Sequence, residues 1–233
     1  EIYKSDWSSD VCSSDLKKLT LKMQVRQEYY RVKELLDGKR PSRMDLFTYM
    51  DDEIYRICVS GSHAKENPFQ HYLDFLYELG ELSEDEQELY AGIGREFIQT
   101  IETTEMQKVY KMPILYSFYN HGNIRLAVTD EEVLESWKEF FDTGTNWKDF
   151  PNVNTYEDYK KVTDKQHLSK AKRMPITRLK MSGKGFFMEK DGYALALRDE
   201  IGEVVGNMAF GKQMGDVLGY RSLEYYRRRY EKE

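Results

Sequence analysis

The strongest chemical signal in this sequence is a run of cations between residues 160 and 184. The run holds nine basic residues and a single acid, Asp164. Lysine and arginine clustered at this density are suited to neutralising the phosphates of a nucleic acid. We therefore predict a DNA-binding surface in this segment. Its candidate residues are Lys170, Lys172, Arg173, Arg178 and Lys180.

Two other basic groups could extend that surface. One contains Lys39, Arg40 and Arg43, in the turn after the first expected helix, and the other is the run Arg227, Arg228 and Arg229. The opposing interpretation is a solvated face, or a face paired with residues 78–105, which hold nine acidic residues and one basic residue. A protein-interaction surface with no nucleic-acid contact is the alternative function.

The local motifs that carry catalysis are absent from the sequence. It contains no GxxxxGK[ST] loop, no GxGxxG, no HExxH and no GxSxG. The stretch IRLAVTDEEV is similar to the magnesium-binding strand of an ATPase, but no phosphate-binding loop precedes it. Thr129 and Glu132 have the spacing of a helix capping box instead. We therefore expect no catalytic residue, metal site or cofactor in this chain, which we do not expect to be an enzyme by itself.

Helices are expected along much of the chain, because apolar residues recur at helical spacing. Val25, Tyr29 and Val32 share one face of an expected helix. Capping boxes at 42–45 and 83–86 predict two helix starts, and the stretches 197–210 and 214–233 are also predicted helices. Asp191-Gly192 lies between apolar runs and predicts a β-hairpin. The expected fold is mainly α, a multi-helix accessory region with a small β-hairpin near the C-terminus.

Residues 1–16, EIYKSDWSSDVCSSDL, resemble a translated sequencing adapter. We expect them to be disordered and exclude them from fold reasoning. The expected divisions of the remaining chain are a helical region at 17–145, a loop or hinge at 146–160, and a basic, hairpin and C-terminal helical region at 161–233. The residues after 16 have a net charge of −3, because the excluded stretch holds four acids and one base.

Cysteine content and hydropathy bear on the cellular environment. Cys58 is the only cysteine after residue 16, which excludes a disulfide framework and fits a reducing cytosol. No apolar run approaches the roughly 18 residues typical of a membrane span. We therefore expect a cytoplasmic protein with no membrane partner.

Several stretches resemble the C-terminal region of bacterial DEAD/DEAH-type superfamily II helicases. They are LLDGKRPSRMDLFTYMD, ETTEMQKVYKMPILYSFYN, GFFMEKDGYALAL and DVLGYRSLEYYRRRY. The resemblance implies a parent protein that is an ATP-dependent nucleic-acid motor of defence or mobile-element settings. Its core, with ATP and Mg²⁺, is expected upstream of Lys17. The resemblance assigns no catalytic residue to the present chain.

Overall fold

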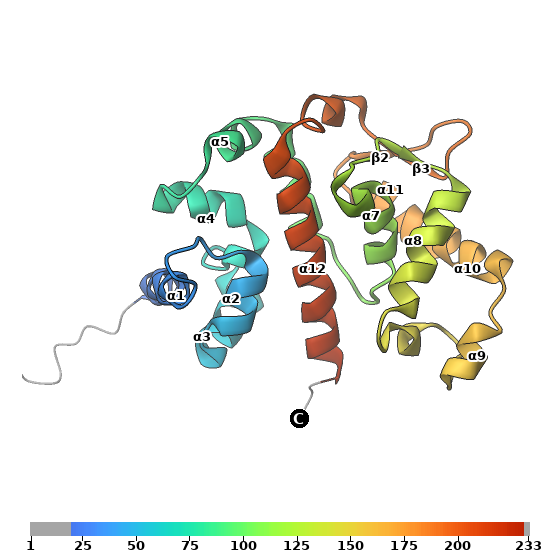
Figure 1. Cartoon of the computed structure of the whole chain (residues 1–233), viewed down its shortest axis with the longest axis horizontal. Helices are drawn as coiled ribbons and strands as arrows, with labels where there is room; N and C mark the ends of the chain where they lie inside the picture. The colour runs from blue at the N-terminus through green and yellow to red at the C-terminus, as the bar shows by residue number, and fades with distance from the viewer. Residues whose placement is uncertain (1–19, 231–233) are drawn as a thin grey trace, which may run out of the picture.

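The computed structural model describes residues 20–230, and Figure 1 shows a molecule built largely of helices. The predicted mainly α fold is therefore confirmed. The prediction for residues 1–16 lies outside the described residues. Every helix between residues 20 and 230 is too short or too polar to cross a bilayer.

The first half of the chain contains a series of helices, the first four of which surround a small core. They are α1 (Leu21–Leu35), α2 (Arg43–Tyr49), α3 (Asp52–Cys58), α4 (Tyr72–Leu79), α5 (Glu84–Ala91) and α6 (Ile93–Thr103), with 3-10 turns at Gly61–His63 and Pro68–Gln70. The predicted apolar face of α1 is buried in this core through Val25, Tyr29 and Val32. Tyr220, from the far end of the sequence, completes the core.

The second half of the chain forms a larger core. Its helices are α7 (Lys111–Tyr119), α8 (Asp130–Asp142), α9 (Tyr156–Lys160), α10 (Asp164–Ala171) and α11 (Thr177–Ser182), with a π-helical turn at Lys172–Ile176 and 3-10 turns at Asn120–Gly122 and Asn146–Asp149. Trp137 and Phe141 of α8 lie at its centre with Phe118 of α7. Phe97 of α6 also belongs to this core, so α6 reaches it from the first half.

Helix α12 (Met208–Tyr230) joins the two cores. Figure 1 shows it between the N-terminal helices and the α7–α11 group. Its Tyr220 packs into the small core, while Val217 and Leu218 pack into the larger one. A single helix therefore provides apolar side chains to both cores.

A small antiparallel sheet lies near α7 and contains the predicted hairpin. Its strands are β1 (Ala127–Val128), β2 (Phe187–Met188) and β3 (Leu195–Leu197), in the order β1-β3-β2. Phe187 pairs with Leu197, and Ala127 pairs with Ala196. The third strand, β1, was not predicted, because its two-residue pairing depends on a partner almost 70 residues away.

The predicted capping boxes are present. Ser42 caps α2 with Asp45, Ser83 caps α5 with Glu86, and Thr129 caps α8 with Glu132, each with both reciprocal hydrogen bonds. These motifs satisfy backbone N–H groups that have no partner within the helix. Such contacts span only three residues, which explains why the sequence was sufficient to predict them.

The helix predicted at 197–210 is wrong. Leu197 belongs to β3, a 3-10 turn covers Asp199–Glu203, and α12 begins only at Met208. Gly202 and Gly206 weaken helix formation in this stretch. The Asn207 side chain then accepts hydrogen bonds from the N–H groups of Ala209 and Phe210, which fixes the start of α12.

The segment 146–160, interpreted as a loop or hinge, contains the 3-10 turn Asn146–Asp149 and helix α9. Phe150 and Tyr159 of this segment are buried, and their rings lie 5.8 Å apart. Residues 148–153 thereby lie against the larger core, where they form one wall of the site described next.

Candidate polyanion-binding groove

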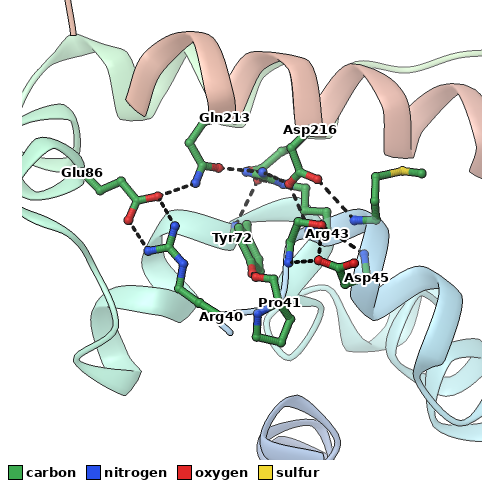
Figure 2. A network of polar contacts seen from close by, with 11 residues as sticks. Arg40, Pro41, Arg43, Asp45, Tyr72, Glu86, Gln213 and Asp216 are labelled. Carbon is green, nitrogen blue, oxygen red and sulfur yellow. Dashed lines mark hydrogen bonds and ion pairs between the residues drawn. The ribbon is translucent and has the colours of Figure 1, made fainter. Parts of the chain in front are cut away.

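Arg43, one of the predicted surface cations, is fully buried (Figure 2). Its Nε donates to Glu102 Oε1 at 2.9 Å, and its Nη1 donates to Asp216 Oδ2 at 2.8 Å and to Gln213 Oε1 at 2.7 Å. Its guanidinium carbon also lies 4.5 Å from the centroid of the Tyr72 ring. Arg43 cannot meet a nucleic acid in this fold, because two carboxylates and the surrounding helices enclose it.

Arg40 belongs to the same network (Figure 2). It forms a two-point ion pair with Glu86, and Gln213 donates to Glu86 Oε1 at 2.7 Å. Burial alone would raise the pKa of the Glu86 carboxyl, but hydrogen bonds from Arg40, the Ser83 N–H and Gln213 bring this pKa below its ordinary value. Both arginines therefore link the N-terminal helices to α5, α6 and α12, and neither is retained as a candidate for DNA contact.

Ion pairs also involve five other predicted cations. Lys172 lies 2.9 Å from Asp130, Arg227 lies 2.5 Å from Asp52, and Lys180 pairs with Glu189. Arg229 lies 2.7 Å from Asp149, and Arg228 lies 3.7 Å from Glu224. These partners reduce the charge that each cation could offer to a phosphate.

The remaining predicted cations are Lys39, Lys170, Arg173 and Arg178, and the last three line one groove. The groove consists of two adjoining hollows of about 520 and 840 Å³, which share Phe150, Pro151, Lys170 and Met174. We call it the basic groove. Its basic lining residues are Lys108, Lys111, Lys148, Lys161, Lys165, Lys170, Arg173 and Arg178.

Much of this positive charge is not neutralised by the protein. Within the described part of the chain, no carboxylate lies within ion-pair distance of Lys148, Lys165, Lys170, Arg173 or Arg178. The Lys170 ammonium lies 5.0 Å from the centroid of the Tyr110 ring, which leaves its charge in place. Three acids, Glu105, Asp149 and Asp158, also line the groove, but the basic residues outnumber them. The groove can therefore offer several cations to a polyanion.

One wall of the basic groove is the continuous helical segment 164–182, which runs through α10, the π-helical turn and α11 (Figure 1). Pro175 lies within the π-helical turn, where its missing N–H cannot complete an α-helical ladder. Met174 and Pro175 of this wider turn line the hollow. The cations that follow the same wall are Lys165, Lys170, Arg173 and Arg178.

Lys111 forms a buried part of the groove lining. Its Nζ donates to Thr104 Oγ1 at 2.9 Å, to the Glu105 carbonyl at 2.8 Å and to Ser182 Oγ at 3.3 Å. Burial lowers the pKa of Lys111. Three acceptors for three N–H donors suit a protonated ammonium. The hydrogen bond to Ser182 also joins Lys111, at the start of α7, to the end of α11.

The acidic segment 78–105 pairs with other parts of the chain. Its Glu78 lies 2.7 Å from Lys22, Glu81 lies 2.7 Å from Lys33, and Glu86 and Glu102 pair with Arg40 and Arg43. No ion pair between residues 20 and 230 joins this segment to residues 160–184. The interpretation in which these two segments neutralise each other is therefore wrong.

The predicted site residues do not include five cations of the groove. Lys161 and Lys165 lie within the basic segment but were not named as candidates. The other three are Lys108, Lys111 and Lys148. They lie before the basic segment in the chain, and local charge density does not mark them. Lys148 is beside the buried Asp149 in a 3-10 turn, and Lys108 lies 3.9 Å from the Asp149 carboxylate. Only the folded arrangement brings these residues to residues 164–182.

Comparison with protein-family models, with curated proteins and with solved structures finds no match for this chain. The functional argument therefore depends on the geometry and charge of the basic groove. The described residues contain no group of three or more His, Cys, Asp or Glu side chains that could hold a metal ion.

Proposed function

We propose that this chain is a nucleic-acid-positioning accessory region, which holds a DNA phosphate backbone in the basic groove. The observation that supports this proposal is the convergence of Lys148, Lys165, Lys170, Arg173 and Arg178 without acidic partners in the described part of the chain. Phosphate contacts of this kind supply affinity and position without reading base sequence.

The proposal extends to a setting beside a helicase core in the same polypeptide. This part rests on the resemblance of the quoted stretches to the C-terminal regions of superfamily II helicases. In that setting ATP hydrolysis and Mg²⁺ binding belong to the core, while the basic groove guides the strand that the core moves. The alternative is a protein-interaction module of a defence or restriction system that makes no direct DNA contact.

The test compares two double variants of the full chain that remove equal charge. In Lys170→Gln/Arg178→Gln, both substitutions lie in the basic groove. In Lys172→Gln/Lys180→Gln, both come from the same segment, but each wild-type lysine already pairs with a carboxylate. Binding of a fluorescein-labelled DNA oligonucleotide is followed by fluorescence anisotropy.

We expect the groove variant to bind DNA about tenfold more weakly than the wild type at low salt, because two phosphate contacts are lost. The control variant should remain within about twofold of the wild type, since its cations are paired. Equal affinities for the two variants would contradict the proposed groove. Absence of DNA binding by the wild type would favour the protein-interaction alternative.

A further inference from the structure

A further hollow, separate from the basic groove, lies between α7, α8 and α12. Its volume is about 490 Å³, which is within the range of sites that hold small ligands. It shares no lining residue with the basic groove. This hollow and the basic groove are therefore two separate surfaces of the molecule.

Aromatic rings form much of the wall of this hollow. They belong to Tyr116 and Tyr119 of α7, Phe140 of α8 and Tyr226 of α12. The Tyr116 ring centroid lies 6.0 Å from that of Phe140 and 6.2 Å from that of Tyr119. The faces of such rings carry negative electrostatic potential and attract cations.

Carboxylates from one face of α8 complete the lining. Glu132, Glu135 and Glu139 follow one another at helical spacing. Glu132 is paired with Arg125 at 3.1 Å. Glu135 has no cationic partner in the described part of the chain, and Glu139 lies 3.6 Å from His121, whose imidazole is charged only when protonated. Two exposed carboxylates thus remain without a permanent counter-charge.

We propose that this acidic aromatic pocket binds an arginine side chain presented by a protein partner. A guanidinium can stack on an aromatic ring and can also pair with a carboxylate through its fixed fork of N–H donors. The pocket offers both kinds of contact, and its charge is complementary to a cation. The same negative charge repels a nucleic acid, so this inference goes beyond the function proposed for the basic groove.

The binding test uses the full chain and two blocked amino acids of similar size. N-acetyl-arginine amide carries the guanidinium, and N-acetyl-citrulline amide replaces it with an uncharged urea group. Binding is mapped by NMR chemical-shift changes. We expect arginine-dependent shifts in residues 116–121, 132–143 and 219–226, with an affinity at least about tenfold above that for citrulline. Equal binding of both probes, or shifts elsewhere, would overturn the proposal.

Two double variants show whether the pocket carboxylates are responsible. Glu135→Gln/Glu139→Gln removes the charges at the pocket, and Glu88→Gln/Glu131→Gln removes two exposed carboxylates outside it. All four side chains are exposed, so we expect both variants to retain the fold. The pocket variant should bind arginine at least about fivefold more weakly, while the control should change by less than about twofold. Equal losses would overturn the assignment to this pocket.

A further binding measurement distinguishes a protein partner from a small polyamine as the ligand of this pocket. A short peptide with one central arginine should bind at least as tightly as N-acetyl-arginine amide, and spermidine should bind more weakly than either. Tighter binding of spermidine would overturn the inference of a protein partner. DNA binding by Glu135→Gln/Glu139→Gln should equal that of the wild type, which keeps this test independent of the basic groove.

Discussion

At the scale of one residue, Arg43 is a cation that the sequence suggests for ligand binding but that the fold buries in an ion-pair network. The sequence places it beside Lys39 and Arg40, where a basic surface is a reasonable expectation. The fold encloses it between Glu102 of α6 and Asp216 of α12, more than 170 residues away in the latter case. Such long-range partners cannot be predicted from the spacing of neighbouring charges.

Replacement of Arg43 should therefore affect stability. Arg43→Met leaves the buried Glu102 carboxylate without its ion pair, and removing one member of a buried pair costs about 3–5 kcal/mol. As a control, Lys22→Met breaks the exposed pair with Glu78 and should cost less than about 1 kcal/mol. Urea denaturation of both variants measures the difference in the free energy of unfolding. Similar small losses would contradict a structural role for the Arg43 network.

Also at the residue scale, His167 is expected to make the free energy of unfolding depend on pH. It is buried on α10 with its ring centroid 4.9 Å from Phe150 and 5.5 Å from Tyr159, and its Nδ1 has no hydrogen-bond partner among residues 20–230. Burial lowers the pKa of His167, and the Lys138 charge lowers it further, while Asp164 and Asp142 oppose both effects. The neutral imidazole is therefore the form that suits this packing.

The sign of the effect follows from proton uptake. An unfolded histidine accepts a proton near pH 6.5, whereas folded His167 accepts one only at lower pH. The free energy of unfolding should thus fall as the pH decreases from about 6.5 toward the lowered pKa. His167→Gln should flatten this part of the curve, and the control His63→Gln, at a partly exposed histidine, should retain it. An unchanged slope in His167→Gln would show that other groups cause the pH dependence.

At the scale of elements, α12 carries glycines at positions 211, 215 and 219 with different surroundings. A Cβ added at Gly219 would lie 3.6 Å from Met44 Sδ, which is ordinary contact. A Cβ added at Gly215 would lie 2.5 Å from the Tyr119 hydroxyl oxygen and 2.8 Å from its ring. Gly215 therefore leaves room for the Tyr119 side chain, which would have to move if a Cβ were added, while Gly219 is not required by its immediate packing.

Alanine at these two positions should have opposite effects on stability. Gly219→Ala should stabilise the protein by up to about 1 kcal/mol, because alanine favours a helix interior. Gly215→Ala should destabilise it by about 1–3 kcal/mol, since Tyr119 must move. Thermal unfolding followed by circular dichroism compares the variants. Stabilisation by both would show that the Tyr119 side chain moves at little cost.

Element prediction succeeded where the determining contacts are local. The capping boxes of α2, α5 and α8 were predicted because each involves residues three apart. The hairpin was also predicted, although its strands are only two and three residues long. Strand β1 and the late start of α12 were missed, because they depend on pairing with β3 and on the Asn207 cap.

At the scale of the whole molecule, the basic groove combines parts of the chain that the sequence keeps separate. Residues 105–111 and 148–153 form walls with the 164–182 segment. The sequence predicted Lys170, Arg173 and Arg178, but charge density alone did not separate them from Lys172 and Lys180, which are paired with acids. The fold therefore determines which cations of the basic segment lie in the groove without an acidic partner in the described part of the chain.

The most direct test of this account is the salt dependence of DNA binding by the full chain. In a plot of log affinity against log salt concentration, each neutralised phosphate contributes a slope of about −0.9 for duplex DNA. The five unpaired groove cations predict a wild-type slope between about −3 and −5. Lys170→Gln/Arg178→Gln should reduce its magnitude by about 2, and Lys172→Gln/Lys180→Gln should leave it nearly unchanged. Equal slopes for the two variants would contradict DNA binding in the basic groove.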